Sequence, residues 1–442
     1  MSRTTTTPAS QPLQPGDPAP AGGGDTAGGA TAVDKPAADK GLIDVSKVSA
    51  EQAVARLVAH GVEVGASDLF FTAHDDAMGV QMRHLGIVRP VSRMPAELGR
   101  KCVAHIKARA AMDITERRRP LDGRWIFDRG DGKGVDLRVN SIPTLYGEDL
   151  ALRVLPREGK AVGLEKLGMN PQQRDQYRSM IYGSGGLILV TGPTGSGKTA
   201  TLYASLRELA DGTRKINTIE DPVEYSIEGL RQSQVNPAID LGFLDLLRSV
   251  LRQNPDVIMI GEIRDAETAK TAVHAANSGI LVFATLHAPA AASAVQTMRS
   301  LGAHQHFLAA SLRGVVAQRL VRTLCPHCRQ AFDVSDAPQT FEEVRHLLND
   351  DEGRTFWAAS GCDQCGRTGY GGQTGVFEVM HVTPTLRHLI ADSRPAREVR
   401  SKAVEEGMLQ FRQSALLKVA RGETTTEEVF RVIPTESLLL ED

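Results

Sequence analysis

The sequence predicts an α/β protein whose largest domain is a parallel sheet built around a glycine-rich loop. An apolar run at 187–190 leads directly into a glycine-rich loop at 192–199, and apolar strand-like segments alternate with helical patterns across 164–322. Such alternation is typical of a parallel sheet covered by helices. Several short strand patterns between 45 and 155 predict a smaller α+β domain before it.

The first 41 residues are expected to form a disordered tail. They are rich in Thr, Pro, Gly and Ala with hardly any large apolar side chain, so they cannot bury enough surface to offset the entropy of ordering.

The whole chain of 442 residues is 41% hydrophobic and has a formal net charge of −2. This balance gives no basic excess that would indicate nucleic acid as the main partner. No apolar run approaches the roughly 20 residues of a membrane span, and there is no signal core, so we expect a cytoplasmic protein.

The smaller domain is predicted over 42–157. Ser49 is expected to cap its first helix, and a second helix is expected over Ala96–Ala111, where Cys102 would be a core residue. A polar linker is expected at 158–163. Turn residues separate the segments predicted as strands, which are Asp68–Phe71, Gly79–Arg83, Ile87–Val91, Arg124–Phe127, Val135–Asn140 and Leu150–Leu155.

The core domain is predicted over 164–322. We expect its strands at Leu187–Val190, Lys215–Ile219, Val257–Ile260 and Gly279–Thr285. Residues 323–377 carry four cysteines and are expected to form a metal-binding subdomain. Residues 378–442 show the patterns of several short helices, with Leu386, Leu389 and Ile390 on one face of the first.

The glycine-rich loop has the complete G-x-x-x-x-G-K-[ST] pattern. Its glycines let backbone N–H groups approach a triphosphate, Lys198 neutralises the β- and γ-phosphates, and the Thr199 hydroxyl is expected to hold Mg²⁺. The alternative is a strand-to-helix turn with no chemical role, which the preceding strand disfavours. The residues expected to bind nucleotide are Gly192, Pro193, Thr194, Gly195, Ser196, Gly197, Lys198, Thr199 and Ala200.

Carboxylates follow two later strands of the core, where their side chains would project beside a γ-phosphate. Glu220 and Glu224 follow the strand at 215–219, and Glu262 follows the strand at 257–260, although Gly261 stands where many Walker B motifs carry Asp. We interpret Glu262 as the residue that activates the attacking water, with Glu220 and Glu224 polarising it or steadying the metal shell. The alternative for each acid is a helix cap or an ordinary position in a loop. His287 ends a third strand on the same edge, and for a lone histidine a structural role is the usual one.

Two C-x-x-C pairs predict a structural zinc site. Cys325 and Cys328 form the first pair, and Cys362 and Cys365 form the second, 33 residues further on. Four thiolates give tetrahedral Zn²⁺ a closed site with no open position for chemistry. A redox function for either pair alone is the alternative.

Three of these segments, together with the loop, resemble the secretion ATPases, the hexameric motors of type II secretion and type IV pilus assembly. Ile219–Tyr225 is similar to the family's aspartate box, Gly261–Asp265 to its Walker B region, and Ala284–His287 to its histidine box. The resemblance covers about Ser67 to Val432 and implies a RecA-like core preceded by a PAS-like domain.

The resemblance also implies roles for single residues. His287 would sense nucleotide next to the γ-phosphate. Arg138 and Arg153 match the two arginines that the family's N-terminal domain places at the nucleotide, and Arg248 and Arg252 match a pair in its core domain. Guanidinium groups spread over the γ-phosphate oxygens would stabilise the transition state. The four cysteines are similar to the insertion of the assembly-type motors, which the retraction-type motors lack.

The chain departs from the family pattern in three places. Ser67–Ala73 keeps only the first part of the usual Ser-Asp-Ile-His-Ile-Glu-Pro, and Ala288–Ala290 replaces the usual Thr-Asn-Asp after His287. We also expect the chain to lack the extra N-terminal domain with which many assembly ATPases dock to an inner-membrane partner.

The resulting prediction is a Mg²⁺-dependent ATPase that works as a homohexamer with zinc in its cysteine site. It would drive pilus or pseudopilus assembly at the cytoplasmic face of the inner membrane through a platform or docking protein, without direct nucleic-acid binding. Two alternatives stay open, a nucleotide-gated scaffold that hydrolyses poorly and a nucleic-acid motor.

Overall fold

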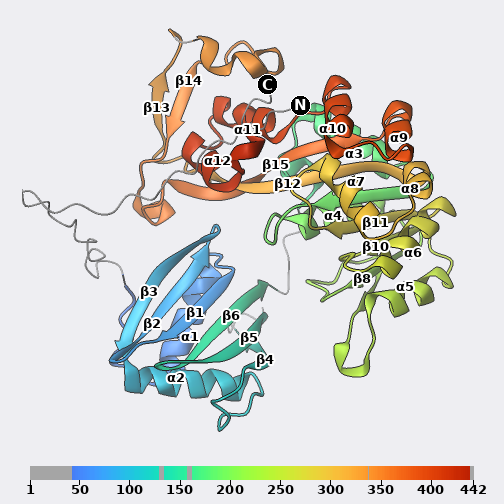
Figure 1. The fold of residues 1–442 in the computed structure, drawn as a ribbon. Helices are drawn as coiled ribbons and strands as arrows, with labels where there is room; N and C mark the ends of the chain where they lie inside the picture. Colours follow the sequence, from blue (N-terminus) through green and yellow to red (C-terminus); the bar gives the residue numbers. More distant parts are fainter. Residues whose placement is uncertain (1–41, 129–133, 157–161, 337, 439–442) are drawn as a thin grey trace, which may run out of the picture. The chain divides into compact units, whose positions relative to one another are not determined.

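The computed structural model describes residues 42–128, 134–156, 162–336 and 338–438 (Figure 1). The predicted tail at 1–41 and most of the predicted linker at 158–163 lie outside these residues. The described chain forms two large sheets and one small hairpin.

The first sheet has six antiparallel strands in the order β3-β2-β1-β6-β5-β4. Every strand and helix predicted in this part of the chain is confirmed, with bounds that differ by a few residues. The elements are α1 (Ala50–Glu63), β1 (Asp68–Ala73), β2 (Ala77–His84), β3 (Ile87–Pro95), α2 (Ala96–Arg109), β4 (Leu121–Asp128), β5 (Gly134–Thr144) and β6 (Gly147–Pro156).

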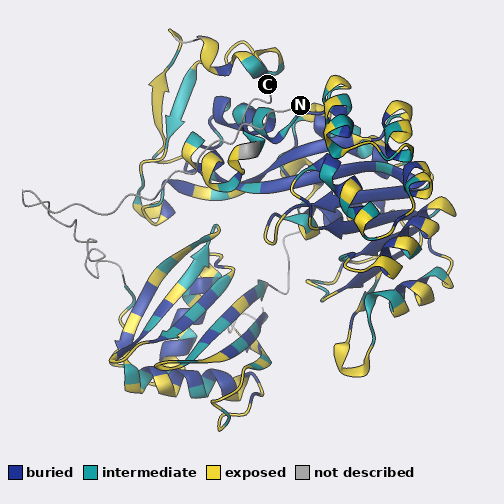
Figure 2. Cartoon of the chain, viewed as in Figure 1, coloured by how far each residue is buried: buried dark blue, intermediate teal, exposed yellow. Residues whose placement is uncertain are grey.

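One face of this sheet packs against α1 and α2. Strand residues alternate between buried and accessible, as Figure 2 shows, because successive side chains of a strand point to opposite faces. Leu69 and Leu137 on the strands join Leu57 of α1 and Ile106 of α2 in a single core. Ser49 caps α1 by accepting from the Gln52 N–H, as predicted, and Cys102 is buried in the same core.

The second sheet has seven strands in the order β15-β12-β7-β11-β10-β8-β9, and all neighbours are parallel except β12 and β15. The four strands predicted for this domain are confirmed as β7, β8, β10 and β11. The strands are β7 (Gly186–Thr191), β8 (Ile216–Glu220), β9 (Leu230–Gln234), β10 (Val257–Ile260), β11 (Leu281–Leu286), β12 (Leu312–Leu324) and β15 (Tyr370–His381).

Helices cover both faces of this sheet, and its central strands are buried (Figures 1 and 2). The core on one face contains residues of α3 (Pro171–Ile181) and α4 (Lys198–Leu209). The core on the other face contains residues of the remaining helices α5 (Phe243–Leu251), α6 (Ala266–Asn277), α7 (Ala291–Ser300), α8 (Gln305–Ser311), α9 (Pro384–Ala391), α10 (Ala396–Glu405), α11 (Phe411–Ala420) and α12 (Thr426–Val432). The short helices predicted after residue 383 are thereby confirmed.

Strands β12 and β15 were not predicted from the sequence. They pair antiparallel from Gly314 to Leu324, so β12 extends past the boundary predicted at 322 and β15 extends across the boundary predicted at 377. The segment that carries the four cysteines therefore leaves the core sheet from one long strand and returns to it in another. Between them lie the hairpin β13 (Gln330–Asp333) with β14 (Thr355–Ala358) and the 3-10 segment η3 (Pro338–Leu347).

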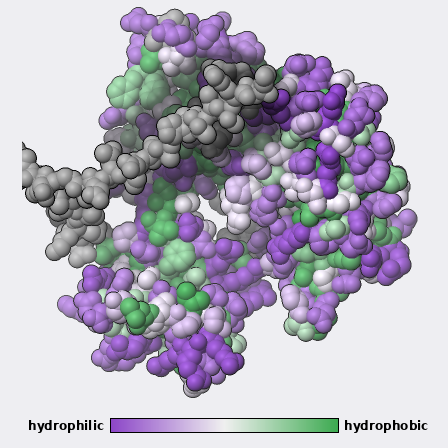
Figure 3. All heavy atoms as spheres, viewed as in Figure 1, coloured by the Kyte–Doolittle hydropathy of each residue, from purple (hydrophilic) through white to green (hydrophobic). Residues whose placement is uncertain are grey.

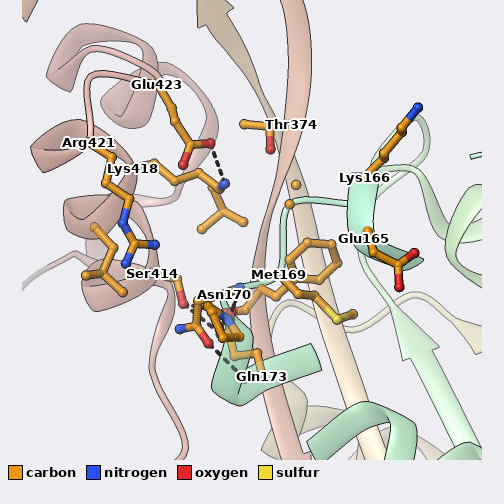
Figure 4. Close-up of a pocket in the computed structure, with 16 residues that line it drawn as sticks. Glu165, Lys166, Met169, Asn170, Gln173, Thr374, Ser414, Lys418, Arg421 and Glu423 are labelled. Carbon is orange, nitrogen blue, oxygen red and sulfur yellow. Dashed lines mark hydrogen bonds and ion pairs between the residues drawn. The ribbon is translucent and has the colours of Figure 1, made fainter. Parts of the chain in front are cut away.

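A polar cavity of about 300 Å³ lies where α3, β15 and α11 meet. Figure 4 shows Lys418 pointing to Glu423, at 2.8 Å, and Gln173 pointing to Ser414, at 3.0 Å. Gln173 also donates to the carbonyl of Phe377. The two bonds of Gln173 therefore link α3 to α11 and to β15 of the core sheet.

Among the described helices, none combines the length and apolar character that crossing a bilayer requires. Hydrophilic side chains dominate the surface seen in Figure 3.

Candidate functional site

The glycine-rich loop lies between β7 and α4, where sequence analysis predicted it. Gly192, Gly195 and Gly197 have φ angles of 149°, 76° and 88°, which favour glycine. A Cβ on Gly192 would lie 2.5 Å from the carbonyl oxygen of Gln318. The helix α4 begins at Lys198, so its N-terminal N–H groups and positive dipole end face the loop.

Lys198 reaches back across this loop. Its Nζ donates to the carbonyl oxygens of Gly192, at 2.8 Å, and Pro193, at 3.1 Å. Partial burial lowers the pKa of Lys198, and the nearby Glu262 charge opposes that shift. The ammonium is therefore held against carbonyl oxygens of the loop itself.

Gln318 of β12 binds the glycine-rich loop and the helix α4 that follows it through two hydrogen bonds. The sequence did not predict a role for this residue. Its Nε2 donates to the carbonyl of Ser196 at 2.7 Å, and its Oε1 accepts from the Thr201 hydroxyl at 2.8 Å. It is buried, so these bonds fix the loop relative to the strand. No local motif marks this residue, because it lies more than 100 positions from the loop.

Glu262 follows β10 and is held on both carboxylate oxygens. Oε1 lies 3.0 Å from His287 Nε2, and Oε2 lies 2.6 Å from Arg264 Nη2. Arg264 Nη1 also lies 3.9 Å from Asp221. The structure thus brings together Glu262 and His287 as predicted and adds Arg264, to which the sequence analysis gave no role although it lies in the Gly261–Asp265 segment.

Neighbouring strands explain why Glu262 and His287 meet. β10 and β11 are parallel partners, so their carboxyl ends lie at the same edge. Beyond the paired residues, the Thr285 hydroxyl donates to the Gly261 carbonyl at 2.5 Å, and the Ile263 N–H donates to the Thr285 carbonyl at 3.0 Å. These bonds fix the segment after β10 relative to the end of β11.

A small cavity of about 80 Å³ adjoins these groups. Thr199, Glu220, Glu224 and Glu262 line it together with Asp221 and Arg264. Hydroxyl and carboxylate oxygens are the ligands that Mg²⁺ prefers, so the donor set fits the magnesium expected at Thr199.

Glu220 is buried, and three side chains donate to its carboxylate. The Tyr203 hydroxyl donates to Oε2, while Thr218 Oγ1, at 2.5 Å, and Gln232 Nε2, at 3.1 Å, donate to Oε1. This arrangement suits a carboxylate that fixes its strand end. Glu224 keeps an exposed side chain at the rim of the cavity.

The segment after His287 is held although its residues depart from the family pattern. Thr191, at the end of β7, accepts from the Ala288 N–H at 2.7 Å, and the Arg319 guanidinium donates to the Pro289 carbonyl at 2.9 Å. Thr191 immediately precedes Gly192. The loop and the His287 segment are therefore joined through one hydroxyl.

The four predicted arginines occupy two separate places. Arg138 and Arg153 are direct cross-strand partners on β5 and β6, and Asp68 on β1 lies opposite Arg153 with a 3.3 Å ion pair. Arg248, on α5, lies 3.8 Å from Glu267. Arg252 follows the end of α5 with an exposed side chain. Within the described residues, neither Arg248 nor Arg252 makes a hydrogen bond or ion pair with the glycine-rich loop.

The four predicted zinc ligands come together in one cluster, with sulfur atoms all within 4.8 Å of one another. The Sγ atoms of Cys325 and Cys362 are 4.0 Å apart, and those of Cys328 and Cys365 are 3.8 Å apart. Tetrahedral Zn²⁺ with bonds of about 2.3 Å requires a sulfur separation of about 3.8 Å. The cysteines therefore fit zinc, and these separations are too long for disulfides.

The sequence of the chain matches a family of known proteins. The sequence model described as "Type II/IV secretion system protein" matches residues 44–431. Type II secretion system protein E of Dickeya dadantii is 40% identical over 380 residues, covering 86% of this chain and 75% of that protein. The type IV pilus assembly ATPase PilB of Pseudomonas aeruginosa is 38% identical over 401 residues, covering 89% of this chain and 70% of that protein.

Solved structures share the fold. The ATPase DotB of Legionella pneumophila aligns with a TM-score of 0.66 at 20% identity, covering 88% of this chain and 98% of DotB. The pilus retraction motor PilT, solved with bound ADP, aligns with a TM-score of 0.57 at 24% identity, covering 85% of this chain and 96% of PilT.

Proposed function

Because the chain belongs to the type II/IV secretion system protein family, and is an ATPase of that family, we propose that it is the Mg²⁺-dependent motor of type II secretion or type IV pilus assembly. The observation that carries the proposal is the position of Glu262 beside the cavity that Thr199 lines at the start of α4. A carboxylate at that place can orient a water for in-line attack on the γ-phosphate.

The residues of the loop would hold ATP, and each has a distinct task. The backbone N–H groups of 192–199 and the Lys198 ammonium would bind the β- and γ-phosphates. Bound Mg²⁺ would neutralise developing phosphate charge, with Thr199 as a protein ligand. Glu220 would fix the end of its strand, and His287 would orient Glu262. Glu224, at the rim of the cavity, would polarise the water or steady the metal shell.

Completion of the site would need further arginines. Arg138 and Arg153 would reach the nucleotide from the N-terminal domain at 42–157, and Arg248 and Arg252 would act at a neighbouring copy in a homohexamer. The exposed side chains of the second pair support this assignment, because another subunit can reach them. A missing arginine finger costs about 10³–10⁵ in rate, so hydrolysis would depend on domain closure and ring formation.

The relatives support the biological assignment. Type II secretion system protein E and PilB are components of secretion and pilus machines by name. This protein would act in the cytoplasm and associate with the inner membrane through a platform or docking protein, with zinc stabilising the subdomain at 323–377. The other domains would be the core at 164–322 and the helical region at 378–442.

Substitution Glu262→Gln tests the catalytic assignment. The amide keeps the size of the side chain but cannot accept a proton from water, so ATP should bind normally while turnover falls at least about 10²-fold. Phosphate release and binding of a fluorescent ATP analogue measure the two quantities. Glu398→Gln, an exposed carboxylate on α10 that pairs with Arg394, is the control. Hydrolysis at the wild-type rate in Glu262→Gln would remove Glu262 from its role.

A further inference from the structure

A second polar pocket lies at the opposite edge of the core sheet from the glycine-rich loop. It has a volume of about 290 Å³ and is formed where the starts of β7, β11 and β12 meet the end of β15 and the helix α9. β7 has its start at this pocket and its end at the loop. Five residue steps of about 3.3 Å each separate the two edges by roughly 17 Å, so a ligand here is not the nucleotide of the loop.

The titratable side chains that line this pocket are all basic. They are Arg313 at the start of β12, His381 at the end of β15 and Arg387 on α9, and no Asp or Glu lines the pocket. Among the described residues, none forms a hydrogen bond or ion pair with the guanidinium of Arg387. Its charge is therefore available to a ligand.

The absence of side chains at two glycines leaves the space that the Arg313 side chain fills. A Cβ on Gly183 would lie 2.0 Å from its guanidinium carbon, and a Cβ on Gly186 would lie 2.6 Å from its Cγ. Its Nη1 donates to the Gly185 carbonyl at 2.8 Å. Its Nε is buried and has no hydrogen-bond partner in the described part of the chain, and a buried donor of this kind calls for a partner.

The pKa of His381 reflects the positive charge that gathers in this pocket. Burial lowers the pKa of His381, and the charges of Arg313 and Arg387 lower it further, against the opposing influence of Glu406. Glu406 itself accepts from the Thr383 hydroxyl at 2.7 Å. The C-terminal ends of α6 and α8 also line the pocket, but each carries only about half a negative charge, which two guanidinium groups exceed.

We propose that this pocket, defined by Arg313, His381 and Arg387, binds a small phosphate-bearing anion. Two guanidinium forks match the oxygen geometry of phosphate and carboxylate alike. A phosphate group carries about −1.5 to −2 charge near neutral pH, which two arginines neutralise, whereas a single carboxylate needs only one. The site does not depend on the ATPase assignment, because it rests on groups outside the loop.

Inorganic pyrophosphate is the probe, titrated calorimetrically into the full chain carrying Lys198→Ala. That background weakens phosphate binding at the glycine-rich loop, so the remaining heat reports on the second pocket. We expect one binding event, weakened at least about tenfold when Arg387→Ala is added, because a hydrogen-bonded charge is lost. Arg394→Ala is the matched control, since this exposed arginine pairs with Glu398 at 3.5 Å and does not line the pocket.

Arg313→Lys provides a second reading, because lysine keeps the charge but loses the planar fork and should also weaken binding. Thermal unfolding of each variant separates lost binding from lost folding. Absence of a binding event in the Lys198→Ala protein would overturn the proposal, as would equal affinity in Arg387→Ala and Arg394→Ala. Succinate binding as tight as pyrophosphate would overturn the assignment to phosphate.

Discussion

The carboxylate of Glu262 and the imidazole of His287 are joined by a contact of 3.0 Å between Oε1 and Nε2. The two residues follow adjacent parallel strands, and the other carboxylate oxygen is held by Arg264. Each carboxylate oxygen of Glu262 therefore has a fixed partner. Because a carboxylate oxygen carries two lone pairs, Oε1 can still accept from a further donor such as a water.

Substitution His287→Ala should lower kcat about 10- to 100-fold with little change in KM for ATP. A hydrogen bond to a charged group contributes about 1.5–3 kcal/mol, and here the bond orients a group that acts in the chemical step. Steady-state phosphate release measures both constants. The control is His274→Ala on α6, an exposed histidine packed near Phe307. A raised KM with unchanged kcat would show that His287 acts in nucleotide binding instead.

Substitution Arg264→Gln should lower kcat by about tenfold or more, because it removes the charged partner of Glu262 Oε2. If Arg264 acts through Glu262, adding Arg264→Gln to the Glu262→Gln variant should have little further effect. A double-mutant cycle on phosphate release measures this coupling. Additive losses would contradict action through Glu262.

Substitution Cys325→Ser should release zinc and unfold the segment between β12 and β15 while nucleotide still binds. Structural zinc contributes on the order of 10 kcal/mol to a site of four thiolates, and the sulfur separations of 3.8–4.0 Å fit such a site. Metal analysis and limited proteolysis measure the two effects. Substitution Cys102→Ser, at a cysteine outside the cluster, should keep the zinc. Purification of an intact wild-type protein without zinc would refute the assignment.

Substitution Glu428→Gln should destabilise the protein by about 3–5 kcal/mol, because it breaks a buried ion pair and leaves arginine charge uncompensated. Glu428, on α12, is fully buried and lies 2.7 Å from Arg322 of β12, and Arg431 Nε donates to it at 2.7 Å. Denaturant unfolding measures the loss. Glu398→Gln, whose partner Arg394 is exposed, should cost less than about 1 kcal/mol.

The same carboxylate predicts a pH dependence of stability. Burial raises the pKa of Glu428, but the hydrogen bonds from Arg431 and Arg322 outweigh burial and leave the pKa below its ordinary value of 4.5. A lowered folded-state pKa stabilises the protein above the unfolded value, and that stability is lost as the pH falls through the folded value. Wild-type stability should therefore fall below about pH 4.5. A variant Glu428→Gln with the same acid-induced loss would contradict this explanation.

The sequence by itself determined the parts of the protein that local patterns encode. The loop at 192–199 fixes its own conformation through glycines and a following helix, and Glu262 and His287 each end an apolar strand of recognisable period. The two C-x-x-C pairs likewise predicted the cluster of four sulfur atoms, whose spacing fits zinc. These features depend on neighbours within a few residues, which a sequence displays directly.

Only the tertiary structure decided which distant side chains meet those parts. Gln318 reaches the loop from more than 100 residues away, and β12 and β15 pair across the whole cysteine segment. Arg264 lay in a recognised segment, but its contact with Glu262 depends on how the chain turns after β10. Strand register and side-chain packing set these contacts, and neither leaves a local pattern in the sequence.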